Sequence, residues 1–248
     1  MTVRIPSPAI LSPRLVRLLR ASVALAVIAA FGAALSGFGY RLGLWPLMAG
    51  FAMLFASAFL AAIAVILGVV VLAIALRARE LRRTAVAAVA ILAGASIAAL
   101  PVSYFEAAKN APRIHDITTD TDDPPQFMAL APLRAASPNG IAYGGAEIAA
   151  AQKLAYSDIA PAQFPNPPDQ VFAAAMAVLQ DKGMEIAASN PPSPAQAGLI
   201  EVTATSFWFG FKDDMAIRIR QAPDGGTRLD IRSASRVGLS DIGANARR

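Results

Sequence analysis

The chain has 248 residues, of which 56% are hydrophobic and 16% are charged, and it carries a formal net charge of +5 at pH 7. It contains no cysteine, which excludes disulfides, thiolate metal sites and cysteine nucleophiles. The net positive charge comes from residues 1–105, which carry a net charge of +8, whereas residues 106–248 carry a net charge of −3. The second part lacks the basic surface that nucleic-acid phosphates require, so no nucleic acid is expected as a partner.

The apolar excess lies almost entirely before Phe105 and is concentrated in three runs. A helix needs about 20 apolar residues to cross a bilayer, and we predict transmembrane helices at about 21–38, 51–76 and 84–104. The lipid bilayer is therefore the first expected partner. A basic segment followed by an apolar run also begins a secretory signal peptide, so cleavage of the first run is kept as an alternative.

The distribution of arginine predicts the orientation of these spans. Four arginines precede the first span and four lie between the second and third, whereas only Arg41 lies between the first and second. The eight are Arg4, Arg14, Arg17 and Arg20, then Arg77, Arg79, Arg82 and Arg83. Because positive flanks stay in the cytoplasm, the N-terminus is expected inside and residues 106–248 in the periplasm. The excess of 18 Arg over 4 Lys is typical of GC-rich bacterial coding, which indicates a bacterial inner (plasma) membrane.

None of the three predicted spans contains Asp, Glu, Lys or His. Ion and proton pathways usually need ionisable groups at membrane depth, so these helices alone are not expected to form a transporter or channel. Small residues such as Gly32, Ala33 and Gly94 suit close helix packing. Residues 1–105 are therefore expected to be an anchor, or a subunit that packs against another membrane or envelope protein.

Residues 106–248 are predicted to form an α+β domain. A short helix is expected at 146–154, and apolar residues at helical spacing from Asp169 to Gly183 predict an amphipathic helix. This helix is expected to cover one face of an antiparallel sheet of about four strands. The four strand-like runs are 184–188, 199–207, 214–220 and 228–233. Pro223–Gly226 is expected to be a hairpin turn, and the tail from Ser240 is expected to begin a short helix.

Five strings in this domain resemble a known family. They are Ile114–Asp120, Asp123–Pro125, Ala155–Ile159, Phe211–Asp214, and Asp230–Gly238 running on to Ser240–Asn245. Together they resemble the bacterial family called domain of unknown function 1499, over about residues 113–248. The resemblance supports the fold and implies no assigned activity. Members of that family often continue as a helix after a stretch like residues 245–248, whereas this sequence stops there, so a C-terminal helix is expected to be truncated.

His115 is the only histidine, and it lies close to Asp116, Asp120, Asp122 and Asp123. Loop carboxylates suit Ca²⁺ or Mg²⁺, but the Gly and terminal Glu of an EF-hand loop are missing. Asp and Thr in loops commonly bond nearby backbone N–H groups instead, so we expect no metal and no cofactor. A periplasmic hydrolase that uses His115, Asp116 and a serine is an alternative, although no Gly-x-Ser-x-Gly elbow occurs.

The run from Arg232 to Arg236 is the other candidate site. Alternation along a strand puts Arg232 and Arg236 on one face and Ser233 and Ser235 on the other. Clustered guanidinium groups can bind carboxylates or phosphates, yet the acids nearby favour cross-strand ion pairs as the simpler interpretation. The candidate ligand-binding residues are His115, Asp116, Asp120, Arg232, Ser233, Ser235 and Arg236.

The aromatic run Phe207–Phe211 links two predicted strands, and the sequence leaves open whether it meets the bilayer, a partner or the core. The whole pattern favours a membrane-tethered, non-catalytic envelope protein whose periplasmic domain binds a partner or a small anionic ligand. Two alternatives remain. One is the hydrolase, and the other is a structural subunit of a membrane complex.

Overall fold

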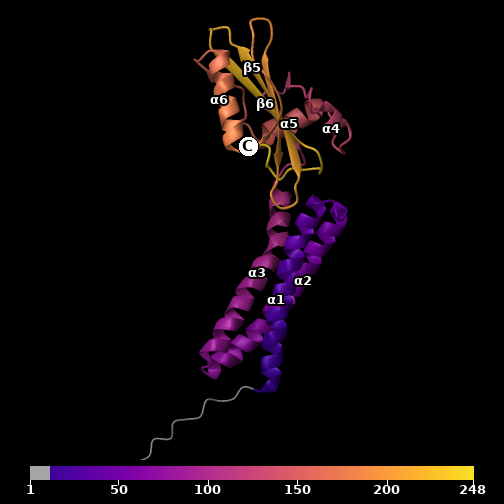
Figure 1. The fold of residues 1–248 in the computed structure, drawn as a ribbon, viewed down its shortest axis with the longest axis vertical. Helices are drawn as coiled ribbons and strands as arrows, with labels where there is room; N and C mark the ends of the chain where they lie inside the picture. Colours follow the sequence, from indigo (N-terminus) through magenta and orange to yellow (C-terminus); the bar gives the residue numbers. More distant parts are fainter. Residues whose placement is uncertain (1–11) are drawn as a thin grey trace, which may run out of the picture. The chain divides into compact units, whose positions relative to one another are not determined.

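The computed structural model describes residues 12–248, so Arg4, which contributes to the expected orientation, lies outside the described residues. The chain divides into two compact units, Met1–Glu106 and Ala107–Arg248. The first contains long helices, and the second contains a sheet with shorter helices on its two sides (Figure 1).

Three helices form the first unit: α1 (Pro13–Arg41), α2 (Leu47–Arg77) and α3 (Leu81–Asn110), whose last four residues belong to the second unit. Each is long and apolar enough to cross a membrane, with mean hydropathies of 2.1, 3.2 and 2.3. Large apolar side chains project outward, and Phe31 and Phe55 are 68% and 61% exposed. A helix with apolar side chains on its outer surface is stable in lipid and not in water. The chain is therefore a membrane protein.

Small residues let these helices approach closely. The Ser22 hydroxyl of α1 donates a hydrogen bond to the Ala64 carbonyl of α2 at 2.8 Å. A Cβ atom added at Gly94 of α3 would lie 3.0 Å from the Ala61 carbonyl oxygen of α2. Close backbone approach of this kind is how helices associate in a bilayer, where burial of apolar surface gives no advantage.

The second unit is built on a six-stranded antiparallel sheet. Its strands are β1 (Asp116–Thr118), β2 (Ala162–Phe164), β3 (Glu185–Asn190), β4 (Gly198–Thr205), β5 (Lys212–Gln221) and β6 (Thr227–Ser235). The order is β1-β6-β5-β4-β3, and β2 also pairs with β6. Strands β3 to β6 correspond to the four predicted strands, whereas β1 and β2 were not predicted because three residues show no periodicity. The α+β class is confirmed.

One face of the sheet is apolar and is covered by helix α6 (Pro168–Asp181), on one side of the sheet in Figure 1. Alternation in β5 and β6 directs Met215, Ile217, Ile219 and Leu229 to this face. They pack with Val171 and Leu179 of α6 and with Ile200 and Val202 of β4. Helix α6 ends before Gly183, whose φ of +63° allows the chain to turn back toward β3.

The other face of the sheet is polar, and the segment from residue 112 to 145 covers it. This segment contains the short helix α4 (Ala131–Ala135), and α5 (Gly145–Ala155) follows it. Gln152 of α5 closes the edge of β1, because its side-chain amide bonds both the N–H and the carbonyl of Thr118, at 2.9 and 2.6 Å. An edge strand covered in this way cannot pair with another chain.

The tail differs from its prediction. Residues 242–247 form consecutive turns and not a helix, although the carboxylate of Asp241 accepts the N–H groups of Gly243 and Asn245 at 2.8 and 2.7 Å, as a helix cap would. Ile242 and Gly243 both adopt positive φ, at +53° and +73°. Two consecutive residues in that conformation end any helical turn.

Candidate functional site

Charged side chains gather on the polar face of the sheet. The alternation that sends apolar residues of β5 and β6 toward α6 sends Arg218, Arg220, Asp230 and Arg232 to the opposite face. Asp230 and Arg232 are 0% exposed. Burial of ions costs several kcal/mol for each ion unless they are paired and hydrogen-bonded (of order 20 kcal/mol in the idealised limit), so the partners of these groups decide what the site can do.

Arg232 of β6 is fully buried against Asp116 of β1. Its Nε donates to Asp116 Oδ1 at 3.0 Å and its Nη2 donates to Asp116 Oδ2 at 2.7 Å. The guanidinium also donates to the Ile141 carbonyl at 2.8 Å. The ring of Phe127 lies under this group, with Arg232 Cζ 4.8 Å from the ring centroid, and Arg134 Cζ lies 4.6 Å from the same centroid. Cation–π contact adds to the ion pair where water is excluded.

A second cluster surrounds Asp214 of β5, which is also fully buried. Arg236 donates to both of its carboxylate oxygens, at 2.9 and 2.8 Å, and Arg134 of α4 donates to one at 3.1 Å. The Thr203 hydroxyl donates to the other at 2.7 Å. Burial alone raises the pKa of Asp214, but the hydrogen bonds from Arg236 and Thr203 and the charges of Arg236 and Arg134 outweigh it. Its pKa therefore lies below the ordinary value.

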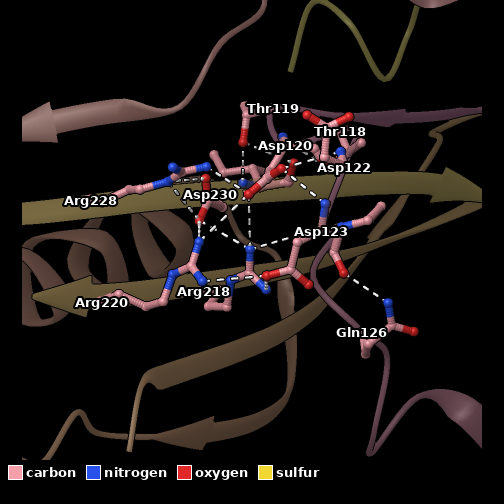
Figure 2. A network of polar contacts seen from close by, with 12 residues as sticks. Thr118, Thr119, Asp120, Asp122, Asp123, Gln126, Arg218, Arg220, Arg228 and Asp230 are labelled. Carbon is pink, nitrogen blue, oxygen red and sulfur yellow. Dashed lines mark hydrogen bonds and ion pairs between the residues drawn. The ribbon is translucent and has the colours of Figure 1, made fainter. Parts of the chain in front are cut away.

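The third cluster joins three arginines to three aspartates. Figure 2 shows Arg218, Arg220 and Arg228 converging on Asp230, while the loop after β1 brings in Asp120 and Asp123. Asp230 accepts from the three arginines at 3.2, 2.8 and 3.0 Å. Asp120 accepts from Arg228 at 2.6 Å, and Asp123 accepts from Arg218 at 2.9 Å. The covering segment is thus attached to the hairpin of β5 and β6 by charge.

Glu201 completes the polar face. It is 0% exposed, and its two carboxylate oxygens accept the backbone N–H groups of Met128, Ala129 and Leu130 at 3.0, 2.9 and 2.9 Å. These donors begin the turn that leads into α4 and have no other partner available in a helix start. The carboxylate of Glu201, on β4, therefore caps this turn.

The charges on this face balance. The face carries six guanidinium groups and six carboxylates: Arg134, Arg218, Arg220, Arg228, Arg232 and Arg236, and Asp116, Asp120, Asp123, Asp214, Asp230 and Glu201. The five aspartates pair with the arginines, whereas Glu201 accepts backbone N–H groups. Each of these arginines already contacts a carboxylate of its own chain. An incoming anion would have to displace one of these carboxylates from its arginine. The arrangement therefore acts as a polar second core that fixes the segment 112–145 to the sheet.

The candidate residues from the sequence are divided among these clusters. Asp116 and Arg232 pair with each other, Asp120 lies in the third cluster, and Arg236 lies in the second. Ser233 and Ser235 lie on the opposite face of β6, where both bond the side chain of Asn245. Ser233 Oγ donates to Asn245 Oδ1 at 2.6 Å, and Asn245 Nδ2 donates to Ser235 Oγ at 3.0 Å.

The backbone of His115 contacts Ser235 and Asn245. Its carbonyl accepts from the N–H of Ser235 at 2.9 Å and from Asn245 Nδ2 at 3.1 Å. Within residues 12–248 no hydrogen bond joins the imidazole to a serine or a carboxylate, and its Nδ1 is buried without a partner. The two elements that a triad needs, a base in contact with a nucleophile and an acid that orients the base, are not brought together in the described residues.

The loop carboxylates after β1 cap their own backbone. Asp120 Oδ1 accepts the N–H groups of Asp122 and Asp123 at 3.3 and 3.0 Å. In the part of the chain that the structure describes, no group of three or more His, Asp or Glu side chains is placed to hold a metal ion. Asp120 therefore caps the turn, and Asp120 and Asp123 form ion pairs with arginines.

Several charged residues of these clusters, and Asn245, were not among the sequence candidates: Asp123, Arg134, Glu201, Asp214, Arg218, Arg220, Arg228 and Asp230. Asp214 and Asn245 lie in the strings that carried the family resemblance, so their contacts explain part of those strings. Glu201 alternates with the core residues Ile200 and Val202 on β4, a signal that places it on the polar face. Arg134 lies in a segment without periodicity, and nothing in the sequence around it indicates burial.

An apolar groove lies on the other face, between α6 and the sheet. Its volume is about 570 Å³, and Ala174, Val178, Met215 and Ile231 line it. Lys182 and Arg248 are its basic lining residues, and Arg248 pairs with Asp213 at 2.9 Å. Sites for small molecules and peptide segments commonly have volumes of roughly 300–1,000 Å³ and mostly apolar walls. The groove is therefore a concave surface of this domain whose size and walls suit a ligand.

Comparison with known proteins gives one match. The family described as "Protein of unknown function (DUF1499)" matches residues 116–248. That range begins at β1 and contains all six strands as well as α4, α5 and α6. No curated protein and no solved structure matches the chain.

Proposed function

Because the chain belongs to the DUF1499 family of proteins of unknown function, we propose a function from its own geometry: a non-catalytic, membrane-tethered protein of the bacterial envelope whose soluble domain binds a partner through the groove beside α6. The proposed partner is an apolar segment of another envelope protein, with acidic residues beside it. The groove of about 570 Å³ is the observation that carries this proposal.

The proposed location is the bacterial inner membrane, with the N-terminus in the cytoplasm and the soluble domain in the periplasm. What supports it is the position of the basic residues among the described helices. Arg14, Arg17 and Arg20 lie at the start of α1, and Arg82 and Arg83 lie at the start of α3. Both ends would face the cytoplasm in this orientation.

The binding role is favoured over catalysis by how the charged groups are used. The carboxylates and guanidinium groups on the polar face contact each other, and the hydroxyls of Ser233 and Ser235 contact Asn245. The same observation favours a partner over a small anionic ligand, since the guanidinium groups that would bind an anion are already engaged. The groove offers apolar surface, and Lys182 among its lining residues complements acidic residues beside the bound segment.

Two substitutions on one helix test this proposal. Ala174 lines the groove, whereas Ala177 is also exposed on α6 and is not among the lining residues. A photoreactive amino acid in place of Val178, in the full-length protein in intact cells, is expected to give one discrete protein adduct. Ala174→Arg should abolish the adduct and Ala177→Arg should preserve it.

Mass spectrometry of the adduct identifies the occupant. A peptide with apolar residues next to Asp or Glu supports the proposed partner. No adduct, an adduct that survives Ala174→Arg, or an adduct to lipid alone would each overturn it. Thermal unfolding of both arginine variants shows whether the domain itself is intact.

A further inference from the structure

The aromatic turn between β4 and β5, residues 206–211, is the feature that the proposed function does not use. It is a closed turn: the N–H of Ser206 donates to the Phe211 carbonyl at 2.8 Å, and the N–H of Phe211 donates to Ser206 Oγ at 2.9 Å. Gly210 adopts a φ of +66°, which permits the tight return. The turn therefore presents its rings in one defined arrangement.

The rings in this turn are not all equally exposed. Phe209 is 5% exposed and stacks on Phe211 with ring centroids 5.4 Å apart, and Trp208 contacts the edge of Phe209 at 5.0 Å. Phe207, in contrast, is 78% exposed. Three of the rings thus contact one another, and Phe207 exposes most of its surface. Exposed aromatic residues at a loop tip indicate a contact surface.

The position of the turn within the domain limits what it can contact. The N–H of Ser235, at the end of β6, donates to the His115 carbonyl at 2.9 Å, and the N–H of Arg236 donates to the Lys212 carbonyl at 3.0 Å. Lys212 directly follows the turn. The segment by which the chain enters the domain and the aromatic turn therefore lie at the same end of the sheet.

The length of the connecting chain limits the distance between that end of the sheet and the predicted third span. Helix α3 ends at Asn110, and four residues later Ile114 is already fixed, since its carbonyl accepts the N–H of Asp241 at 3.3 Å. Four residues span at most about 14 Å. The predicted span ends near residue 104, so α3 extends past the hydrocarbon by about 9 Å, similar to the headgroup layer of about 5–8 Å on each side.

The chemistry of the turn suits that layer. Trp and other aromatic residues are favoured where the hydrocarbon meets the headgroups. The turn has no charged residue, and the one that follows it, Lys212, is a cation that anionic headgroups attract. We propose that the aromatic turn inserts into the headgroup–acyl boundary of the membrane in which the chain is anchored, and so forms a second attachment of the domain to the bilayer.

Trp208 itself reports on this contact, because the chain has only two tryptophans. Trp45→Phe leaves Trp208 alone. The full-length variant is reconstituted into phosphatidylcholine vesicles, with or without bromine on the acyl chains. Trp208 is expected to lose most of its emission in brominated vesicles, to emit at shorter wavelength than in unfolded protein, and to resist aqueous acrylamide.

Matched changes separate insertion from general binding. Phe207→Asp should remove the quenching, whereas Leu154→Asp, at a residue of α5 that is 91% exposed, should leave it unchanged. Equal emission in both kinds of vesicle would overturn the proposal. Acrylamide quenching would then place the turn in water, and protection from acrylamide would place it against protein.

A second measurement leaves both tryptophans in place. Since the chain has no cysteine, Phe207→Cys can be labelled with an environment-sensitive dye in the full-length protein. Quenching of the dye by brominated acyl chains supports insertion, and an emission unchanged between the two kinds of vesicle contradicts it.

Discussion

Arg232 of β6 holds Asp116 of β1 through two parallel hydrogen bonds, at 3.0 and 2.7 Å, with 0% and 5% of the two side chains exposed. The two residues are 116 positions apart in the chain. The pair joins the first strand of the domain to the last, and Phe127 stacks on its guanidinium group. The polar face is therefore held by specific geometry and not by general burial.

Removal of one partner of this pair is expected to destabilise the domain strongly. Arg232→Met leaves Asp116 buried without its cation, which should lower the free energy of unfolding by about 3–5 kcal/mol. The double variant Arg232→Met with Asp116→Leu should lose less than the sum of the two single variants, because neither charge is then buried alone. Urea unfolding of the full-length protein, followed by Trp fluorescence, measures all three. Additive losses would show that the pair is not coupled.

The aspartates of the network in Figure 2 should contribute unequally to the free energy of unfolding. Asp230 has a fully buried side chain in contact with three arginines, whereas the side chain of Asp123 is 64% exposed. Asp230→Asn is expected to lower the free energy of unfolding by about 3–5 kcal/mol, and Asp123→Asn by about 1 kcal/mol or less. The same urea experiment at low and high salt tests the difference, since only the exposed pairs should respond to salt. Similar losses in the two variants would contradict this assignment.

The sequence predicts the apolar half of this domain well. Helical spacing identifies α6, and alternation identifies β4, β5 and β6, because each element repeats its signal over at least eight residues. The polar half was predicted only in part. Charged residues such as Glu201 and Asp214 are expected on the surface, and their burial depends on partners that lie up to 80 residues away. The alternation places Arg232 on the correct strand face without indicating which carboxylate it meets.

Asp214 should make the domain sensitive to acid. Its pKa in the folded protein lies below the ordinary value, as described above, and an unfolded chain has an ordinary Asp pKa of about 3.9. The stabilisation is therefore complete above about pH 4 and is lost as the pH falls through the lower, folded pKa. Asp214→Asn should reduce the slope of unfolding free energy against pH below about pH 4. Asp181→Asn, an exposed residue of α6, serves as the control and should keep the wild-type slope.

Tyr143 should make the stability of the domain depend on pH under alkaline conditions. The pKa of Tyr143 is raised to about 12, mainly by burial and also by the charge of Asp116, while Arg232 opposes the shift. The folded domain keeps this proton above pH 10, where the unfolded chain releases it, so stability falls as the pH rises from about 10 toward 12. Absorbance at 295 nm in wild type minus Tyr143→Phe should show one transition near pH 12. A transition near pH 10 would show that the hydroxyl is exposed. The hydroxyl has no partner among the described residues, so its removal should change stability at pH 7 by about 1 kcal/mol or less.

The orientation of the helices can be tested without changing any charge, because the chain has no cysteine of its own. Single cysteines at Leu42, between α1 and α2, and at Ala195, between β3 and β4, are expected to react with a membrane-impermeant maleimide in intact cells. A cysteine at Leu81, at the start of α3, should react only after the cells are permeabilised. Leu42 and Leu81 are 73% and 84% exposed, and Ala195 is exposed as well, so access differs by side of the membrane and not by burial. The arginines near Leu81 carry this prediction, because four of them flank it and only Arg41 lies near Leu42. Labelling of the Leu81→Cys variant in intact cells, with Ala195→Cys protected, would reverse the orientation and place the groove beside α6 in the cytoplasm.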